Sequence, residues 1–180
     1  MNALWKSISI GMVFVCTGVS AQQMTLKWER ITPKYATADA FVAGLNVTDY
    51  GADPTGTTDQ TVLFQNLLDF LGSRTNNNGR KSDGTPNGGT LFLPEGKYLI
   101  KGVLTLPKGV TIRGEWEKPV KGQPIKGTII VVDNPSAREH DCTLLPNGLP
   151  GTAYEVQSTI TMQPSSAVRD LAFWYPNQDP

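Results

Sequence analysis

The sequence of 180 residues is poor in cysteine, in histidine and in net charge, and each shortage excludes a class of protein. Its two cysteines, Cys16 and Cys142, are too few for the disulfide framework of a small secreted module. His140 is the only histidine, so the usual zinc site of several histidines or cysteines is not expected. Sixteen basic residues balance sixteen acidic ones. Nothing in this balance attracts a polyphosphate backbone, and nucleic acid is not expected as a partner.

Glycine and proline are abundant instead, with 18 and 13 residues. Residues of these two types punctuate chains at turns, so a succession of short strands is favoured over a bundle of long helices. The apolar content of 39% and the charged content of 18% are those of an ordinary globular protein. A chain of this length can bury a core of its own.

Residues 1–21 have the pattern of a secretory signal peptide. Lys6 supplies the positive charge, residues 8–19 the apolar stretch, and Val19-Ser20-Ala21 a cleavage site of small residues. The apolar stretch is shorter than the roughly 20 residues that span a bilayer. We therefore expect cleavage after Ala21, no membrane attachment afterwards, and a secreted, periplasmic or cell-envelope location. Cleavage would leave Cys142 as the only cysteine.

Residues 22–45 form a mixed lead-in, and residues 46–56 are expected to be a short strand that runs into a Gly/Asp/Pro turn. A helix is predicted over about 59–71. Thr58 or Asp59 can cap its first amides, and Gly72 can end it. Residues 73–89 are expected to form a polar loop. Apolar residues recur at helical spacing at Val62, Leu63, Leu67, Phe70 and Leu71.

From residue 90 the apolar period changes to two, which predicts four short strands in quick succession. The strands are separated by glycine-containing corners, and the pattern returns weakly at 128–132, 158–162 and 168–175. Such spacing fits either a hairpin meander or sandwich, or the successive strands of a β-solenoid. Periodicity alone does not separate these architectures. The alternating pairs are Leu91 and Leu93, Tyr98 and Ile100, Leu104 and Leu106, and Val110 and Ile112.

An ordered series of short motifs resembles the N-terminus of the rhamnogalacturonase/epimerase-like, pectate lyase 3 type of β-helix protein, which is related to polygalacturonases. The series is NVTDYGA at 46–52, TTDQT at 57–61, FQ at 64–65, GTLFLPEGKYLI at 89–100 and LTLPKGVTIRG at 104–114. VRDLAFWY at 168–175 looks like a further strand of the same kind. The family commonly has two acidic residues at the helix start, whereas Gln60 follows Asp59 here. We interpret Asp59 as a helix cap and not as a catalytic group.

The resemblance implies an all-β fold, a right-handed parallel β-helix (single-stranded solenoid) with an N-terminal capping α-helix. Residues 46–180 would be the N-terminal part of this domain, truncated before the active-site rungs. The capping helix would cover the open apolar end of the first rung, where unpaired strand edges promote aggregation. With about two rungs and no cap at the far end, the isolated mature segment is expected to be marginally stable.

The resemblance also implies a polysaccharide as the partner and substrate. We expect a glycoside hydrolase that acts through paired carboxylates on later rungs. The alternatives are a pectate-type lyase, which could use calcium, and a non-catalytic, adhesin-like glycan binder. No other cofactor is expected.

The candidate site residues within the chain are few. The clustered aspartates and Gly-His-Gly of polygalacturonases are not found, so no catalytic residue is identified and the segment alone is expected to be inactive. The run Arg138–Cys142, around His140, is interpreted as a solvated loop and not as a metal site. Trp174 and Tyr175 are the candidate substrate-binding residues, because aromatic rings stack on sugars. In a strand their side chains alternate, so one of the two should face outward; packing in the core is the alternative.

Overall fold

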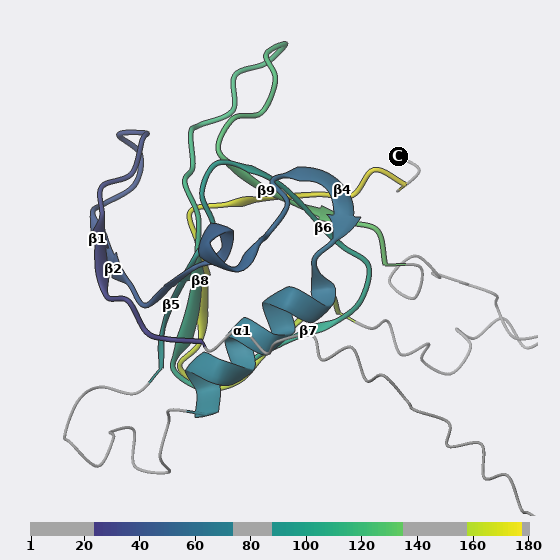
Figure 1. Cartoon of the computed structure of the whole chain (residues 1–180). Helices are drawn as coiled ribbons and strands as arrows, with labels where there is room; N and C mark the ends of the chain where they lie inside the picture. The colour runs from purple at the N-terminus through teal and green to yellow at the C-terminus, as the bar shows by residue number, and fades with distance from the viewer. Residues whose placement is uncertain (1–23, 74–87, 135–157, 178–180) are drawn as a thin grey trace, which may run out of the picture.

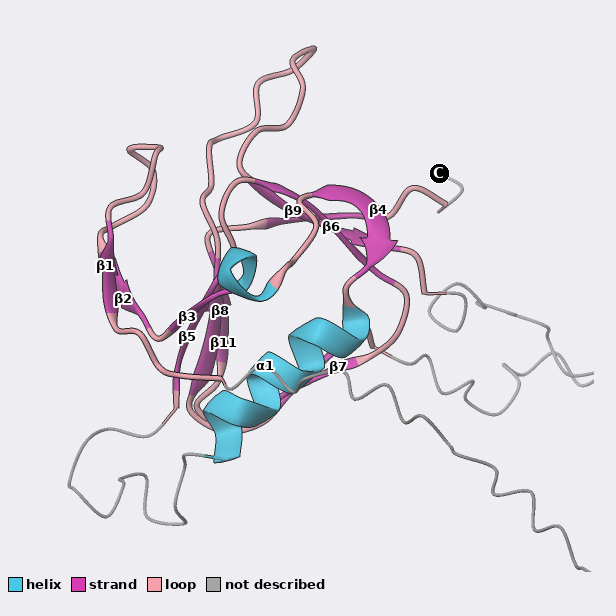
Figure 2. Cartoon of the chain, in the orientation of Figure 1, coloured by secondary structure: helices cyan, strands magenta, loops and turns pink. Residues whose placement is uncertain are grey.

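The computed structural model describes residues 24–73, 88–134 and 158–177. These residues form a mostly β structure with a single α-helix (Figures 1 and 2). The predicted signal peptide and the loop around His140 lie outside the described residues. The elements are β1 (Glu29–Ile31), β2 (Phe41–Ala43), β3 (Leu45–Asn46), the 3-10 helix η1 (Val47–Tyr50), β4 (Thr55–Asp59), α1 (Thr61–Ser73), β5 (Gly89–Phe92), β6 (Gly96–Ile100), β7 (Leu104–Leu106), β8 (Val110–Arg113), β9 (Thr128–Val132), β10 (Ile160–Met162), β11 (Ala167–Arg169) and β12 (Ala172–Trp174).

The strands from β3 onward are parallel and lie in three sheets. One sheet has the order β3-β5-β8-β11, the second β4-β6-β9-β12, and the third contains β7 and β10. Consecutive strands therefore enter different sheets, and the chain returns to each sheet after one coil. We use "coil" for a passage through the sheets in that order, such as β5-β6-β7. Because β5 pairs with β8 and not with β6, the hairpin meander is excluded.

The register between coils stacks apolar side chains on apolar side chains. Leu91 pairs with Ile112, and Ile112 with Val168. Tyr98 pairs with Ile130 in the second sheet. Alternation turns these residues to one face of each strand, where they meet the other sheets. All eight residues of the predicted alternating pairs are fully buried: Leu91, Leu93, Tyr98, Ile100, Leu104, Leu106, Val110 and Ile112.

Helix α1 confirms the predicted helix, but it begins two residues later, at Thr61. Asp59 is still the last residue of β4, and its carboxylate accepts a hydrogen bond from the Thr61 backbone N–H at 2.9 Å. Asp59 thus satisfies one of the free amides of the first turn, as a capping residue does. The apolar face of α1 enters the core through Phe64, Leu67, Leu68 and Leu71.

Helix α1 also covers the free edge of β7. The Gln65 side chain accepts a hydrogen bond from the Thr105 N–H at 2.8 Å and donates one to the Thr105 carbonyl at 3.2 Å. A side-chain amide therefore makes the two bonds that a neighbouring strand would make. In the first coil, β3-β4-α1, the helix stands where the third sheet would have its strand (Figure 1).

The prediction of a strand that continues after residue 46 is wrong, because the strand ends at Asn46. Val47 and Thr48 belong to η1, because the Asn46 side chain accepts a hydrogen bond from the Thr48 N–H and turns the chain there. The lead-in is also more ordered than the sequence predicted. Its two strands, β1 and β2, pair as an antiparallel hairpin.

Candidate functional site

An open groove of about 270 Å³ lies on the outer face of the sheet β4-β6-β9-β12. Strand β6 contributes Lys97, β9 contributes Ile129 and β12 contributes Trp174. Pro124 and Ile125 come from the excursion between β8 and β9, the loop that projects at the top of Figure 1. The groove is therefore built from three coils and one long connection.

Strand alternation explains why these side chains point away from the core. Tyr98 and Ile100 are buried inward, so Lys97 and Leu99 of the same strand face outward. The register then extends this outer face, because Lys97 pairs with Ile129 and Leu99 with Val131. Leu99, Ile129 and Val131 form a buried apolar cluster on that face, separate from the main core.

Trp174 is the predicted site residue that lines the groove. It pairs with Val131 in the register of β12 with β9, which places it on the outer face. Its side chain is 45% exposed, and the Lys97 ammonium nitrogen lies 5.4 Å from the centroid of its ring. This distance is that of a cation–π contact, worth about 0.5–1 kcal/mol at an exposed site. The groove thus combines an aromatic face, an ammonium and aliphatic walls.

Tyr175, the second predicted residue, is 39% exposed but does not line the groove. It follows the last residue of β12. Alternation had left open which of the two aromatic residues faces outward, and the register assigns the outer face to Trp174. Phe173 points to the opposite, inner face and pairs with the buried Ile130.

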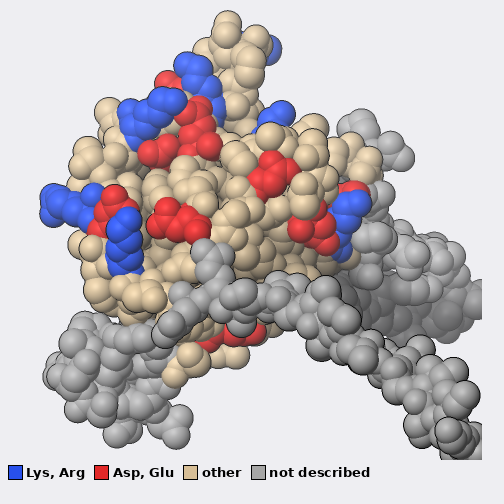
Figure 3. Space-filling view, in the orientation of Figure 1, with Lys and Arg blue, Asp and Glu red and all other residues tan. Residues whose placement is uncertain are grey.

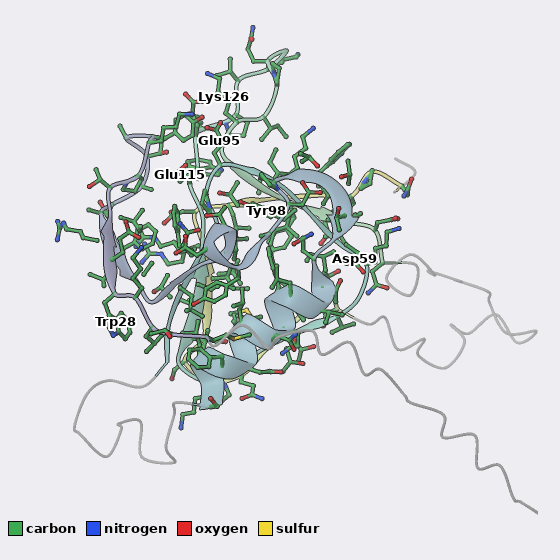
Figure 4. All side chains as sticks on the ribbon, in the orientation of Figure 1. Trp28, Asp59, Glu95, Tyr98, Glu115 and Lys126 are labelled. Carbon is green, nitrogen blue, oxygen red and sulfur yellow. The ribbon has the colours of Figure 1, made fainter. Side chains whose placement is uncertain are left out.

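Sequence reasoning missed a second cluster of polar residues, at the corner between the two large sheets. The backbone N–H groups of Lys34 and Glu95 each donate to the Glu115 carboxylate at 3.2 Å. Glu95 in turn accepts hydrogen bonds from the Tyr35 hydroxyl, at 2.6 Å, and from the Lys34 ammonium. Figure 4 shows Glu95 and Glu115 at this corner, and Figure 3 shows basic and acidic side chains interleaved there. No local motif signals this cluster, because the residues that bond one another are 20 to 81 positions apart.

The charges at this corner favour a structural role over acid catalysis. Hydrogen bonds from Lys34 and then from Tyr35 hold the pKa of Glu95 below its ordinary value. A general acid needs the opposite shift, since it must keep its proton near the working pH. The two carboxylates therefore anchor the β1–β2 hairpin to the corners of the second and third coils.

Other perturbed groups are also held in structural contacts. Partial burial opposes ionisation of Asp59, but hydrogen bonds from Thr61 and from the Lys101 backbone outweigh it, so its pKa is lowered. Hydrogen bonds from Thr55 and Thr57 lower the pKa of Asp53 in the same way. Burial raises the pKa of Tyr98, whose hydroxyl donates to the Pro94 carbonyl at 3.0 Å.

Within residues 24–73, 88–134 and 158–177, no three His, Cys, Asp or Glu side chains gather as a metal site. The same ranges contain no helix that is long and apolar enough to cross a membrane. His140 and Cys142 lie outside these ranges.

The fold is that of a mostly β protein with stacked parallel sheets, of the β-helix-like type. Its parallel strands recur in the same order, short glycine corners connect them, and one helix lies against a strand edge. The family is given by sequence comparison. The model of the family described as rhamnogalacturonase A/epimerase, pectate lyase-like matches residues 44–165, and the chain belongs to this family of polysaccharide-processing enzymes. No curated protein and no solved structure matches the chain.

Proposed function

We propose that this protein processes an extracellular polysaccharide as a glycoside hydrolase. The observation that carries the proposal is the in-register stacking of parallel strands in a member of this family. Residues i and i+2 of a strand lie about 6.6 Å apart on one face, and neighbouring strands about 4.8 Å apart. Inverting glycosidases place their two carboxylates about 6.5–9.5 Å apart, and retaining enzymes about 5–5.5 Å. A scaffold of this kind can hold a carboxylate pair at either separation.

The proposal includes the finer architecture and the export of the protein. We infer that the three parallel sheets are the first coils of a right-handed parallel β-helix, with α1 as its cap. Residues 1–21 would direct export to the cell envelope or beyond. N-terminal sequencing of the exported protein should find Gln22 as the first residue. Retention of Met1 in the exported protein would contradict the cleavage after Ala21, and absence of the protein from the exported fraction would contradict the export step.

Within the described residues, Trp174 and Tyr175 are proposed to contact the sugar. The support is strongest for Trp174, whose half-exposed ring borders the groove. An aromatic ring offers a flat apolar face that matches the C–H face of a pyranose, at a low entropic cost. Tyr175 would extend this contact from the residue next to it.

A lyase is the alternative that the family description favours, because it includes pectate lyase-like proteins. Lyases abstract the proton beside the uronate carboxylate and stabilise the resulting negative charge with a cation or an arginine. A non-catalytic glycan binder is the second alternative, favoured by the groove itself. The three functions differ in their products.

The test is to incubate the full-length protein, with the later rungs that would carry the paired carboxylates, with pectic and other plant or algal glycans and to analyse the products. A hydrolase produces new reducing ends without unsaturated sugars, which is the result that we expect. If the products are unsaturated and a calcium chelator prevents their formation, the protein is a lyase and not a hydrolase. Binding without any product would leave only the glycan-binding role.

A further inference from the structure

We propose that the groove of Lys97, Pro124, Ile125, Ile129 and Trp174 is a subsite for a sugar ring that carries an anionic substituent. In this arrangement the Trp174 ring stacks on the sugar, and the Lys97 ammonium binds its carboxylate or sulfate. This inference rests on the proposed function, since it specifies the chemistry of the glycan that this site accepts.

The size and walls of the groove fit a single ring. Its volume of about 270 Å³ lies just below the range of about 300–1,000 Å³ that is typical of pockets for larger ligands. One wall is aromatic, and the others are the aliphatic side chains of Pro124, Ile125 and Ile129. Such walls can contact the C–H groups of a sugar, and the groove is open to solvent.

The charge of the groove gives its specificity. Among the described residues that line it, Lys97 is the one that carries a charge, and none of them is a carboxylate that would repel an anion. Lys34, Lys101 and Lys126 each form an ion pair with an acidic side chain. Lys97 has no ion pair with a carboxylate of the described residues, and its side chain is exposed. Its ammonium can therefore bind an anion without breaking an ion pair.

The backbone holds Lys97 at this place. Gly56 of β4 has a φ of +78°, and a Cβ at this residue would come within 2.9 Å of the Lys97 Cβ. The missing side chain leaves space for the lysine stem to lie against β4. The ammonium lies on the other side of β6, near Trp174 of β12, which is beyond β9 in the same sheet.

The test uses the purified protein and three oligosaccharides of equal length: a galacturonate oligomer, a sulfated galactan oligomer and a neutral galactan oligomer. Affinities are measured by calorimetry at low salt. We expect the wild type to prefer an anionic oligomer, and the comparison of the first two identifies the anion. Lys97→Gln should weaken that binding about tenfold, as the loss of a charge-assisted hydrogen bond does, and should weaken neutral binding by clearly less. Lys108→Gln is the control, because Lys108 is an exposed lysine in the connection between β7 and β8.

Trp174 variants separate this proposal from the broader one. Trp174→Ala should lower the affinity for every oligomer that binds, and Trp174→Phe, which keeps an aromatic ring, should retain part of that affinity. Equal affinity for neutral and anionic oligomers, or the same loss in the Lys97 and Lys108 variants, would overturn the anionic subsite alone. If no oligomer binds and the incubations described above yield no product, the proposed function fails as well. Thermal melting of each variant shows whether a loss of binding is a loss of folding.

Discussion

Replacement of Gln65 by alanine is the sharpest test of how α1 completes the third sheet. Gln65 makes both bonds to the Thr105 peptide, and its amide nitrogen also donates to Asp69 at 2.7 Å. The N–H and C=O of Thr105 both point to α1, whereas its neighbours Leu104 and Leu106 make the hydrogen bonds on the β10 side. Gln65→Ala would therefore leave an N–H and a C=O of β7 without protein partners on the helix side.

The expected cost follows from the burial of that peptide. A typical hydrogen bond contributes about 0.5–1.5 kcal/mol, and an unsatisfied buried group costs about 1–3 kcal/mol. Thr105 is half-buried, so water can reach it in part. We expect Gln65→Ala to lower the free energy of unfolding by about 2 kcal/mol, the sum of two bonds of ordinary strength. For a chain of this size this corresponds to a decrease in Tm of about 4–8 °C.

Urea denaturation followed by circular dichroism measures the loss, and amide hydrogen exchange locates it at Thr105. Gln65→Glu is the informative second variant, because a carboxylate keeps the acceptor for the Thr105 N–H but loses the donor to its carbonyl. It also brings a second carboxylate against Asp69, so at neutral pH its stability should be no higher than that of Gln65→Ala. Gln163→Ala is the matched control, since Gln163 is an exposed glutamine whose side chain accepts one bond, from the Lys108 N–H at 3.2 Å. It should cost about 0.5 kcal/mol or less.

One result would refute the reasoning. If Gln65→Ala is as stable as Gln163→Ala and the Thr105 amide exchanges at the wild-type rate, the glutamine does not complete the strand edge. The contribution of α1 would then come only from its apolar face.

Three further predictions concern the corner and the sheet edges. The pKa of Glu95 in the folded protein lies below its ordinary value of 4.5, so the ion pair of Glu95 stabilises the fold above pH 4.5 and loses this effect as the pH falls through the folded pKa. Glu95→Gln should therefore reduce the decrease of Tm at acidic pH. An unchanged decrease of Tm at acidic pH would contradict this role of Glu95. Gly56→Ala should destabilise the protein by more than the roughly 1 kcal/mol that a positive φ costs alanine, because the new Cβ would also collide with Lys97 of β6. Gly51→Ala, at φ +84° with no atom within 4 Å of the new Cβ, should cost only the strain of the positive φ. Equal losses of stability in urea would rule out the collision with β6. Arg113 is 7% exposed and forms an ion pair with Asp170. Arg113→Met should lower the free energy of unfolding by about 3–5 kcal/mol, because it leaves the Asp170 carboxylate partly buried without its partner, and Asp170→Asn should lower it by less. A loss under 1 kcal/mol for Arg113→Met in the urea assay would argue against a structural ion pair.

The sequence predicts those parts of the fold that depend on local pattern. Alternation identified the buried residues of β5 to β8, and helical spacing identified α1, because both signals lie within a few consecutive residues. It did not predict η1, since the side chain of Asn46 overrides the strand preference of Val47 there. It also did not choose between a meander and parallel sheets, because that choice depends on which strand each strand finds as a neighbour.

The groove was only half predictable for the same reason. Alternation predicted that Trp174 or Tyr175 faces outward, but the choice between them comes from the pairing of β12 with β9. Lys97 has no signal of its own, since a lysine in a strand is usually a solvated charge. It becomes a residue of the proposed subsite only when β6, β9 and β12 stack and bring it next to a tryptophan 77 positions later in the chain.

Register therefore couples the stability of this protein to its proposed chemistry. Lys97 and Tyr98 are adjacent in β6, one on the groove face and the other fully buried. A slip of one residue would exchange their faces, which would place an ammonium in the core and a buried phenol in the groove. Burying an unpaired ammonium is far more costly than any contact in an open groove can offset. The packing of Tyr98 on Ile130 thus fixes the position of Lys97 beside Trp174, and variants that loosen this inner stack should weaken anionic binding before they unfold the protein.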